Sequence, residues 1–184
     1  MITVSIIGTS GRGCLNAMNK KIYKKMIIKT KDIIENHFKL DPKNICLVSG
    51  GAAWADHVVV KLYLDKYVSN ALLYLPCQWN HVSGKYVDRI QDHHNVAHIA
   101  NQYHDLFSKK MKCNTLYEIQ KAINQGLIIN TSNYGFKNRN IEVAKSDYLI
   151  AFTWNRVIPQ KGGTAHTWKN TSTSQKIHIN LENL

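Results

Sequence analysis

Three short glycine-rich segments hold the residues of this chain that are best suited to contacting an anion. They are Gly8-Thr9-Ser10-Gly11-Arg12-Gly13, Ser49-Gly50-Gly51-Ala52 and Lys161-Gly162-Gly163-Thr164. Glycine permits a tight turn and a close approach of the backbone to a ligand, and the N–H groups that begin a helix are free to bind negative charge. The spacing matches neither the dinucleotide-binding GxGxxG pattern nor the phosphate-binding GxxxxGK[ST] pattern. A plain turn between a strand and a helix would explain any one of the three segments alone.

Polar side chains in and after these segments add chemistry of their own. Thr9 and Ser10 bring hydroxyls, and Arg12 brings a fork of donors. Asp56 follows the second segment and could accept a hydrogen bond from a ribose hydroxyl, hold the neighbouring loop, or complement a helix dipole. His166 follows the third segment and could contact a phosphate, act as a general acid or base, or pack within its helix.

The elements that must position these residues alternate between strand and helix. Short apolar runs predict strands, and longer amphipathic patterns predict helices. The predicted strands cover residues 2–7, 45–48, 71–75, 148–153 and 176–180. The predicted helices cover residues 15–38, 52–67, 87–110 and 116–124. This order predicts an α/β fold with a mostly parallel central sheet, and it places the glycine segments at the carboxyl ends of strands, where such sheets bind ligands.

Four segments in this order also carry a family resemblance. IIGTSGRG, LVSGGAAWADHVVV, RNIEVAKSDYLIAF and KGGTAHTW resemble the SLOG superfamily, the Rossmann-like group that includes the DNA-processing protein DprA and the LOG nucleotide phosphoribohydrolases. Within it the chain looks most like the YspA-type branch. The second segment departs from that branch at Trp54, where glycine is usual. The resemblance implies a Rossmann-like three-layer sandwich, a single domain over residues 1–184, and a site for a nucleotide or a nucleotide-derived molecule.

The resemblance leaves three functions open. The first is a sensor, or a protein that sequesters a nucleotide signal without turning it over. The second is a LOG-like hydrolase of the nucleotide N-glycosidic bond, whose signature includes a glutamate after the last glycine turn. Here Thr164 is followed by Ala165-His166-Thr167-Trp168, so the catalytic residues are not identified, and His166, Glu142 and Asp56 are the candidates for such a role. The third is DprA-like binding of single-stranded DNA.

The predicted ligand site combines the three turns with an Arg-Asn pair from the third motif. We expect Arg139→Ala to weaken ligand binding and to leave the fold intact. The expected ligand-binding residues are Gly8, Thr9, Ser10, Gly11, Arg12, Ser49, Gly50, Gly51, Asp56, Arg139, Asn140, Gly162, Gly163, Thr164 and His166.

The charge of the chain permits nucleic-acid binding without requiring it. The net charge is +12, from 24 basic and 12 acidic residues. Only four of the basic residues are arginine, the side chain suited to bidentate phosphate contacts, and the lysines could equally form a solvated face. Two of the four, Arg12 and Arg139, lie in the motif segments.

Several other side chains have both a functional and a packing interpretation. His94 and His98 are spaced to share a metal on one helical face, although surface histidines are the simpler interpretation, and no metal site or cofactor is predicted. Trp79 and Trp154 could each stack on a base or pack in the core. The polar segment Asn130–Tyr134 could cover the pocket.

The remaining features indicate a cytoplasmic protein. The N-terminus lacks the pattern of a secretory leader, no apolar stretch could span a bilayer, and the four widely spaced cysteines form no zinc pattern. Cys46 lies in an apolar run and is expected in the core. The resemblance implies a homodimer or higher homo-oligomer.

Overall fold

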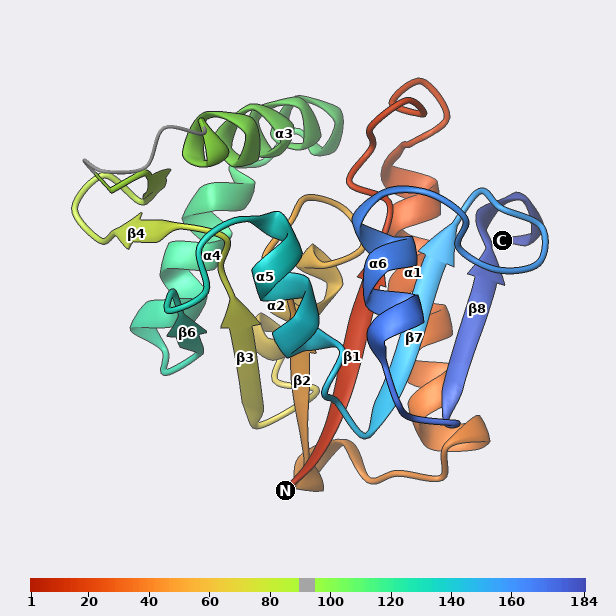
Figure 1. The fold of residues 1–184 in the computed structure, drawn as a ribbon. Helices are drawn as coiled ribbons and strands as arrows, with labels where there is room; N and C mark the ends of the chain where they lie inside the picture. The colour runs from red at the N-terminus through yellow and green to blue at the C-terminus, as the bar shows by residue number, and fades with distance from the viewer. Residues whose placement is uncertain (90–94) are drawn as a thin grey trace.

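A six-stranded parallel sheet forms the centre of the molecule, in a computed structural model that describes residues 1–89 and 95–184 (Figure 1). Its strand order is β6-β3-β2-β1-β7-β8, and every neighbouring pair is parallel. The strands are β1 (Ile2–Gly8), β2 (Ile45–Ser49), β3 (Asn70–Tyr74), β6 (Ile128–Asn130), β7 (Tyr148–Thr153) and β8 (Lys176–Asn180). The five predicted strands are confirmed, and β6 is an addition at one edge.

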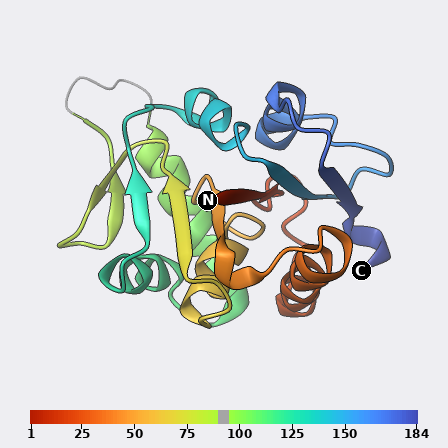
Figure 2. The same ribbon diagram turned by 90° about the horizontal axis from the view of Figure 1, so that it is seen from below.

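Helices cover both faces of this sheet. Figure 1 shows α5 and α6 in front of the sheet and α1, α2 and α4 behind it, and the view from below shows the same two layers (Figure 2). The predicted Rossmann-like three-layer sandwich is therefore confirmed. The helices are α1 (Lys20–Asp32), α2 (His57–Leu64), α3 (Val96–Met111), α4 (Thr115–Asn124), α5 (Phe136–Val143) and α6 (Gly162–Asn170).

Burial of the central strands explains why their sequences are continuously apolar. Val4, Ile6 and Leu47 are fully buried, because helices cover both faces of a parallel sheet. From α2, Val58 and Leu62 are also fully buried, as predicted from their spacing. Cys46 was expected in this core but is only half-buried, at the margin of a second cluster under α5 and α6.

The first helix is shorter than the predicted 15–38 span. Asn19 caps its start, since its side-chain oxygen accepts hydrogen bonds from the backbone N–H of Lys21 and Ile22. Residues before this cap form turns. At the other end the chain passes into a π-helical turn at Ile33–His37. The polar cap therefore outweighs the helical pattern that begins upstream of it.

The second helix also begins later than predicted, at His57 instead of residue 52. Trp54 adopts a left-handed conformation with φ of +63°, which no α-helix accommodates. The Asp56 carboxylate accepts hydrogen bonds from the backbone N–H groups of Gly50 and Ala52 and folds the chain into a turn there.

The predicted helix over 87–110 is partly wrong. A two-stranded antiparallel hairpin, β4 (Gln78–Asn80) with β5 (Lys85–Val87), precedes α3. Trp79 and Tyr86 face each other across the hairpin with their rings edge to face at 5.0 Å, and this aromatic pair stabilises it.

Short 3-10 turns occur at Pro42–Asn44 and Leu181–Asn183.

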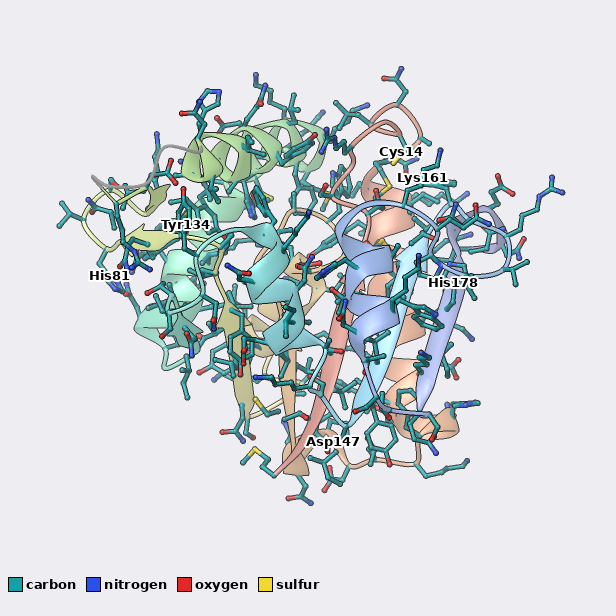
Figure 3. All side chains as sticks on the ribbon, in the orientation of Figure 1. Cys14, His81, Tyr134, Asp147, Lys161 and His178 are labelled. Atoms are coloured by element: carbon teal, nitrogen blue, oxygen red, sulfur yellow. The ribbon has the colours of Figure 1, made fainter. Side chains whose placement is uncertain are left out.

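The two ends of the parallel strands lie on opposite sides of the molecule and carry different residues. Cys14 and Lys161 lie at the carboxyl edge, whereas Asp147 lies at the amino edge (Figure 3). There Asp147 accepts hydrogen bonds of 2.8 Å from the backbone and the hydroxyl of Thr3, which joins the starts of β1 and β7. Within residues 1–89 and 95–184, no helix is long and apolar enough to cross a membrane.

Candidate functional site

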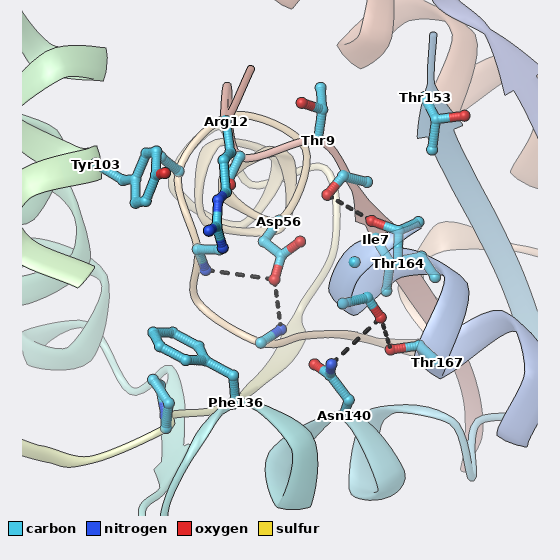
Figure 4. A pocket seen from close by; sticks show the side chains of 18 of the residues that line it. Ile7, Thr9, Arg12, Asp56, Tyr103, Phe136, Asn140, Thr153, Thr164 and Thr167 are labelled. Carbon is cyan, nitrogen blue, oxygen red and sulfur yellow. Dashed lines mark hydrogen bonds between the residues drawn. The ribbon is translucent and has the colours of Figure 1, made fainter. Parts of the chain in front are cut away.

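A cavity of about 630 Å³ opens at the carboxyl edge of the sheet, between the ends of β1, β2 and β7 (Figure 4). The chain leaves β1 toward β2 and β3 on one side, and it returns to β7 and β8 on the other side. Such a reversal of strand order leaves a crevice at the carboxyl ends of the strands. The position of the cavity therefore follows from the topology of the sheet.

The loop after β2 is built around the carboxylate of Asp56. One oxygen of this buried side chain accepts from the backbone N–H of Gly50 at 3.0 Å and of Ala52 at 3.3 Å. The same oxygen accepts from Nη1 of Arg139 at 3.0 Å. Three donors thus hold Asp56, which supports the loop-holding interpretation of this residue.

Two further buried side chains fix the carbonyl of Gly51. The Tyr86 hydroxyl donates to it, and Nε2 of His104 lies 3.0 Å from it. Because a carbonyl only accepts, Nε2 of His104 carries the proton, and Nδ1 accepts from the hydroxyl of Thr115 at 3.0 Å. Burial lowers the pKa of His104 to about 3, so the imidazole is neutral near pH 7. The loop after β2 is therefore held on both sides by buried, uncharged or ion-paired groups.

Gly50 is required by the position of Arg139. A Cβ atom at Gly50 would lie 0.8 Å from Nη1 of Arg139, so the guanidinium occupies the space that any side chain would need. Arg139 is 7% exposed and belongs to α5. Its Nε is buried and has no hydrogen-bond partner among the residues that the structure describes. The guanidinium is therefore held by Asp56 and packed against Gly50, and its Nε donor is left unused.

The start of α6 forms the third wall of the cavity. Thr164 donates from its hydroxyl to the carbonyl of Gly8 at 2.8 Å, which ties α6 to the end of β1. The side-chain amide of Asn140 donates to the carbonyl of Gly163 at 3.2 Å, and so does the Thr167 hydroxyl. Gly162, Gly163 and Thr164 are the first residues of α6 and line the cavity, and the start of a helix favours an anion.

The loop after β1 is anchored through Thr9, whose backbone N–H donates to the carbonyl of Phe152 at 2.9 Å. Thr9 accepts from the backbone N–H of Gly11 at 3.0 Å, and its hydroxyl lies 3.2 Å from the thiol of Cys14. Arg12 is exposed and makes no ion pair with any part of the chain that the structure describes. Figure 4 shows its side chain reaching from this loop toward the centre of the cavity.

Aromatic rings stand along the cavity beside these polar groups. Tyr103 from α3 and Phe136 from α5 line one side of it (Figure 4). Trp154, at the end of β7, lines another part, and its buried Nε1 lacks a hydrogen-bond partner within the described residues. A planar ring could pack against these faces while its polar groups meet the free donors.

The charge of the lining is unbalanced. Arg12, Arg139 and Lys161 line the cavity, and Asp56 is the one carboxylate among the lining residues that the structure describes. Since Asp56 is already paired with Arg139, the lining carries excess positive charge. The arrangement favours an anionic ligand.

Most of the predicted site residues meet at this cavity. Those that line it are Gly8, Thr9, Ser10, Arg12, Gly50, Gly51, Asp56, Arg139, Asn140, Gly162, Gly163 and Thr164. Gly11 and Ser49 are buried behind the loops, where the Ser49 hydroxyl donates to the carbonyl of Asp56 at 3.0 Å. Neither His166 nor Glu142 lines the cavity, and Glu142 pairs with Lys145 at 2.8 Å.

The other candidates have different outcomes. Trp79 is buried in the hairpin, where its Nε1 donates to Gln120 at 2.7 Å, so its packing interpretation is confirmed, whereas Trp154 does line the cavity. No residue of Asn130–Tyr134 lines the cavity, so this segment does not cover it. His98 is exposed, and its predicted metal partner His94 lies outside the described residues.

Sequence reasoning missed the aromatic residues that line the cavity from α3 and α5. Phe136 stands three residues before Arg139, which places both on one face of α5 and could have indicated it. Tyr103 has no such signal, because its position depends on how α3 packs across the end of the sheet.

Comparison with known proteins identifies a viral relative. No family model matches the chain. It is 36% identical over 183 residues to "Uncharacterized protein R261" of Acanthamoeba polyphaga mimivirus, over 98% of this chain and 96% of that protein. The chain belongs to the family of this mimivirus protein. That relative's name states no activity, so the function must be argued from the cavity.

Proposed function

We propose that this protein binds a nucleotide or a nucleotide-derived anion in the cavity and does not turn it over, as a sensor or a sequestering protein. The observation that carries the proposal is the lining itself. Three cationic side chains and the start of α6 face a cavity whose carboxylate is already bound by three donors. Phosphates fit the cationic part, and a base fits the aromatic part.

The same lining argues for binding over hydrolysis. Cleavage of an N-glycosidic bond needs a group that stabilises an oxocarbenium-like transition state, usually a carboxylate. Asp56 is held in its ion pair, and Glu142 is turned to Lys145. We therefore place the hydrolase second and DprA-like binding of single-stranded DNA third.

The backbone at Trp54 supports membership of the SLOG superfamily. The YspA-type branch usually has glycine at this position, and here the backbone is left-handed, with φ of +63°. Glycine is common at such a position because it has no Cβ atom and adopts the left-handed conformation without strain. Trp54 keeps the conformation and fills the core instead, where its ring lies 4.3 Å from that of Phe107. We retain the superfamily, a homo-oligomeric state and a cytoplasmic location as parts of the proposal.

The test is a thermal-shift panel on the purified protein. The panel holds nucleoside monophosphates, ADP-ribose, cyclic ADP-ribose isomers, cyclic oligonucleotides, NAD and a short single-stranded DNA, with the matching unphosphorylated nucleosides as controls. A ligand at about 100 times its dissociation constant adds about 2.7 kcal/mol of stability. We expect a phosphorylated compound to shift the transition and its nucleoside to leave it unchanged.

Chromatography of the same mixtures then separates binding from catalysis. We expect the ligand to be recovered intact after hours with the protein. Release of a free base would replace the sensor with the hydrolase, and a shift with DNA alone, lost at high salt, would favour the third function. If no compound on the panel shifts the transition, the proposal fails.

A further inference from the structure

Lysines from two separate helices meet on the side of the molecule that carries α1, away from the lining of the cavity. We call this set the lysine patch, and it consists of Lys20, Lys21, Lys24, Lys25, Lys109, Lys110 and Lys112. In Figure 1, α3 runs across the upper edge of the sheet toward the loop that leads into α1. The ring of Tyr23 in α1 packs edge to face against the ring of Phe107 in α3, with 5.2 Å between their centroids, so the start of α1 lies beside the end of α3. Burial and Glu118 raise the pKa of Cys113, just after α3, and the nearby charges of Lys20 and Lys61 oppose that rise.

The first four lysines stand where they destabilise their own helix. Lys20 and Lys21 are the first two residues of α1, and no acidic residue occurs in its first turn. The start of a helix carries partial positive charge, so cations there are unfavourable. Lys24 and Lys25 follow at i+4 from each of these residues and repel them further. Lysines that serve only solubility would not need to stand at the start of a helix, where they are unfavourable.

The patch also lacks the acidic partners that lysines have elsewhere in the chain. Lys29 pairs with Asp32 and Lys145 pairs with Glu142, each at 2.8 Å. In residues 1–89 and 95–184, no carboxylate forms an ion pair with a lysine of the patch. Two acidic residues nearby have other partners, since Asp65 pairs with Lys61 and Glu118 pairs with His57, and exposed Asp105 stands one turn before Lys109 on α3. The seven lysines therefore leave the patch with a large excess of positive charge.

We propose that the lysine patch binds the phosphate backbone of a nucleic acid without reading its sequence. Lysine is a point charge on a flexible stem, which suits phosphates and does not fix a base edge. The lysines recur along the first two turns of α1, and a nucleic acid offers a regular row of negative charges to match them. This surface is separate from the cavity, so the inference does not depend on the identity of the small ligand.

An anionic membrane fits the patch less well. A helix that lies in a membrane surface buries an apolar face among the lipids. The apolar face of α1 is already used in the core, where Tyr23 and Met26 are buried. The helix exposes one large apolar side chain, Ile28, and this gives no continuous apolar face.

The test measures binding of a labelled 20-base-pair DNA duplex by fluorescence anisotropy between 50 and 200 mM NaCl. One variant carries Lys20→Gln, Lys24→Gln, Lys109→Gln and Lys112→Gln. The matched control carries four exposed lysines without ion pairs among the described residues, changed in the same way elsewhere in the chain, and these are Lys39, Lys85, Lys137 and Lys169. Both variants lose the same charge, so only the place of the charge differs.

We expect the patch variant to bind at least tenfold more weakly at 100 mM NaCl, with the dependence of log affinity on log salt reduced by roughly one for each phosphate that is no longer neutralised. The control should change affinity less than threefold. Equal losses in the two variants would reduce the effect to net charge and overturn the proposal. So would absence of duplex binding at 50 mM NaCl, or binding to phosphatidylserine vesicles in place of the duplex. Urea unfolding of both variants checks that each remains folded, and the mononucleotides of the thermal-shift panel test the cavity independently of the patch.

Discussion

The two glycine loops that lie side by side at the cavity, after the neighbouring strands β1 and β2, are held by different groups. In the loop after β2, the N–H groups of Gly50 and Ala52 and the carbonyl of Gly51 all bind buried side chains. In the loop after β1, the side chain of Arg12 is exposed and has no ion pair with the described residues. One loop is fixed before any ligand arrives, and the other keeps its strongest donor available.

This difference assigns separate tasks to residues that look alike in the sequence. A preorganised loop holds its shape at no further cost when a ligand binds, whereas an exposed arginine must be ordered by the ligand. Changes in the loop after β2 should therefore act first on the stability of the fold. Changes in the loop after β1 should act first on affinity.

Asp56→Ala should have the largest effect on stability. It removes the partner of a buried guanidinium and of two backbone N–H groups, and breaking a buried ion pair costs about 3–5 kcal/mol. Urea unfolding should show a lower midpoint with an unchanged slope. Asp105→Ala is the control, since Asp105 is exposed on α3 and should change the free energy of unfolding by less than about 0.5 kcal/mol. Equal midpoints for the two variants would mean that Asp56 does not hold the loop.

The same geometry changes the expectation for Arg139→Ala. On the sequence alone, this variant is expected to lose ligand binding with its fold intact. Arg139 is buried against Asp56, so its removal leaves a buried carboxylate with one donor fewer. A loss of affinity in that variant would combine two effects, and Arg139 is a poor single probe of the site.

Gly50→Ala and Gly13→Ala separate steric from conformational roles of glycine. At Gly50 a Cβ would lie 0.8 Å from Nη1 of Arg139, so the guanidinium must move and the variant should lose about 1–3 kcal/mol. At Gly13 nothing lies within 4 Å of an added Cβ, and only the φ of +74° opposes alanine, at about 1 kcal/mol. Thermal unfolding of both variants measures the difference. A larger loss at Gly13 would reverse the comparison of the two loops.

How much the sequence could predict follows the same division. Short, continuously apolar runs identified five strands, because strands in the interior of a parallel sheet are buried on both faces. The glycine segments at their ends indicated the edge where the cavity lies. The short hairpin and β6 escaped, because three-residue strands have too few residues for a period to show.

The support for the glycine loop could not be read from the sequence at all. His104 and Tyr86 reach Gly51 across sequence separations of 53 and 35 residues. Their identities are ordinary for a helix and a strand. Only the packing of α3 and the hairpin against the loop gives them a role.

His104 makes the fixed loop sensitive to acid. Its pKa is about 6.5 when unfolded and is lowered to about 3 in the fold, mainly by burial and also by His57. Between these values the unfolded chain binds a proton that the folded chain does not, so stability is complete above pH 6.5 and falls as the pH falls toward 3. The loss should reach about 2 kcal/mol at pH 5, and it is measured by urea unfolding from pH 7 to 5.

The variant His104→Gln should flatten this pH dependence, even though it weakens the fold at pH 7. His98→Gln, on the exposed side of the same helix, should leave the dependence as it is in the parent. A steep loss that survives in His104→Gln would assign the acid sensitivity to other histidines.

Arg12→Gln should have the smallest effect on stability and a clear effect on binding. The side chain is exposed and has no ion pair within the described residues, so the free energy of unfolding should change by less than about 0.5 kcal/mol. Loss of a charge-assisted hydrogen bond to a phosphate costs about 1.5–3 kcal/mol, which is roughly a 10- to 150-fold loss of affinity. Titration with the compound that gives the largest thermal shift measures it. Arg156→Gln is the control, because Arg156 is equally exposed but does not line the cavity, and it should bind as the parent does. If both variants bind as the parent does, the loop after β1 takes no part in recognition, and the division of tasks between the two loops is wrong.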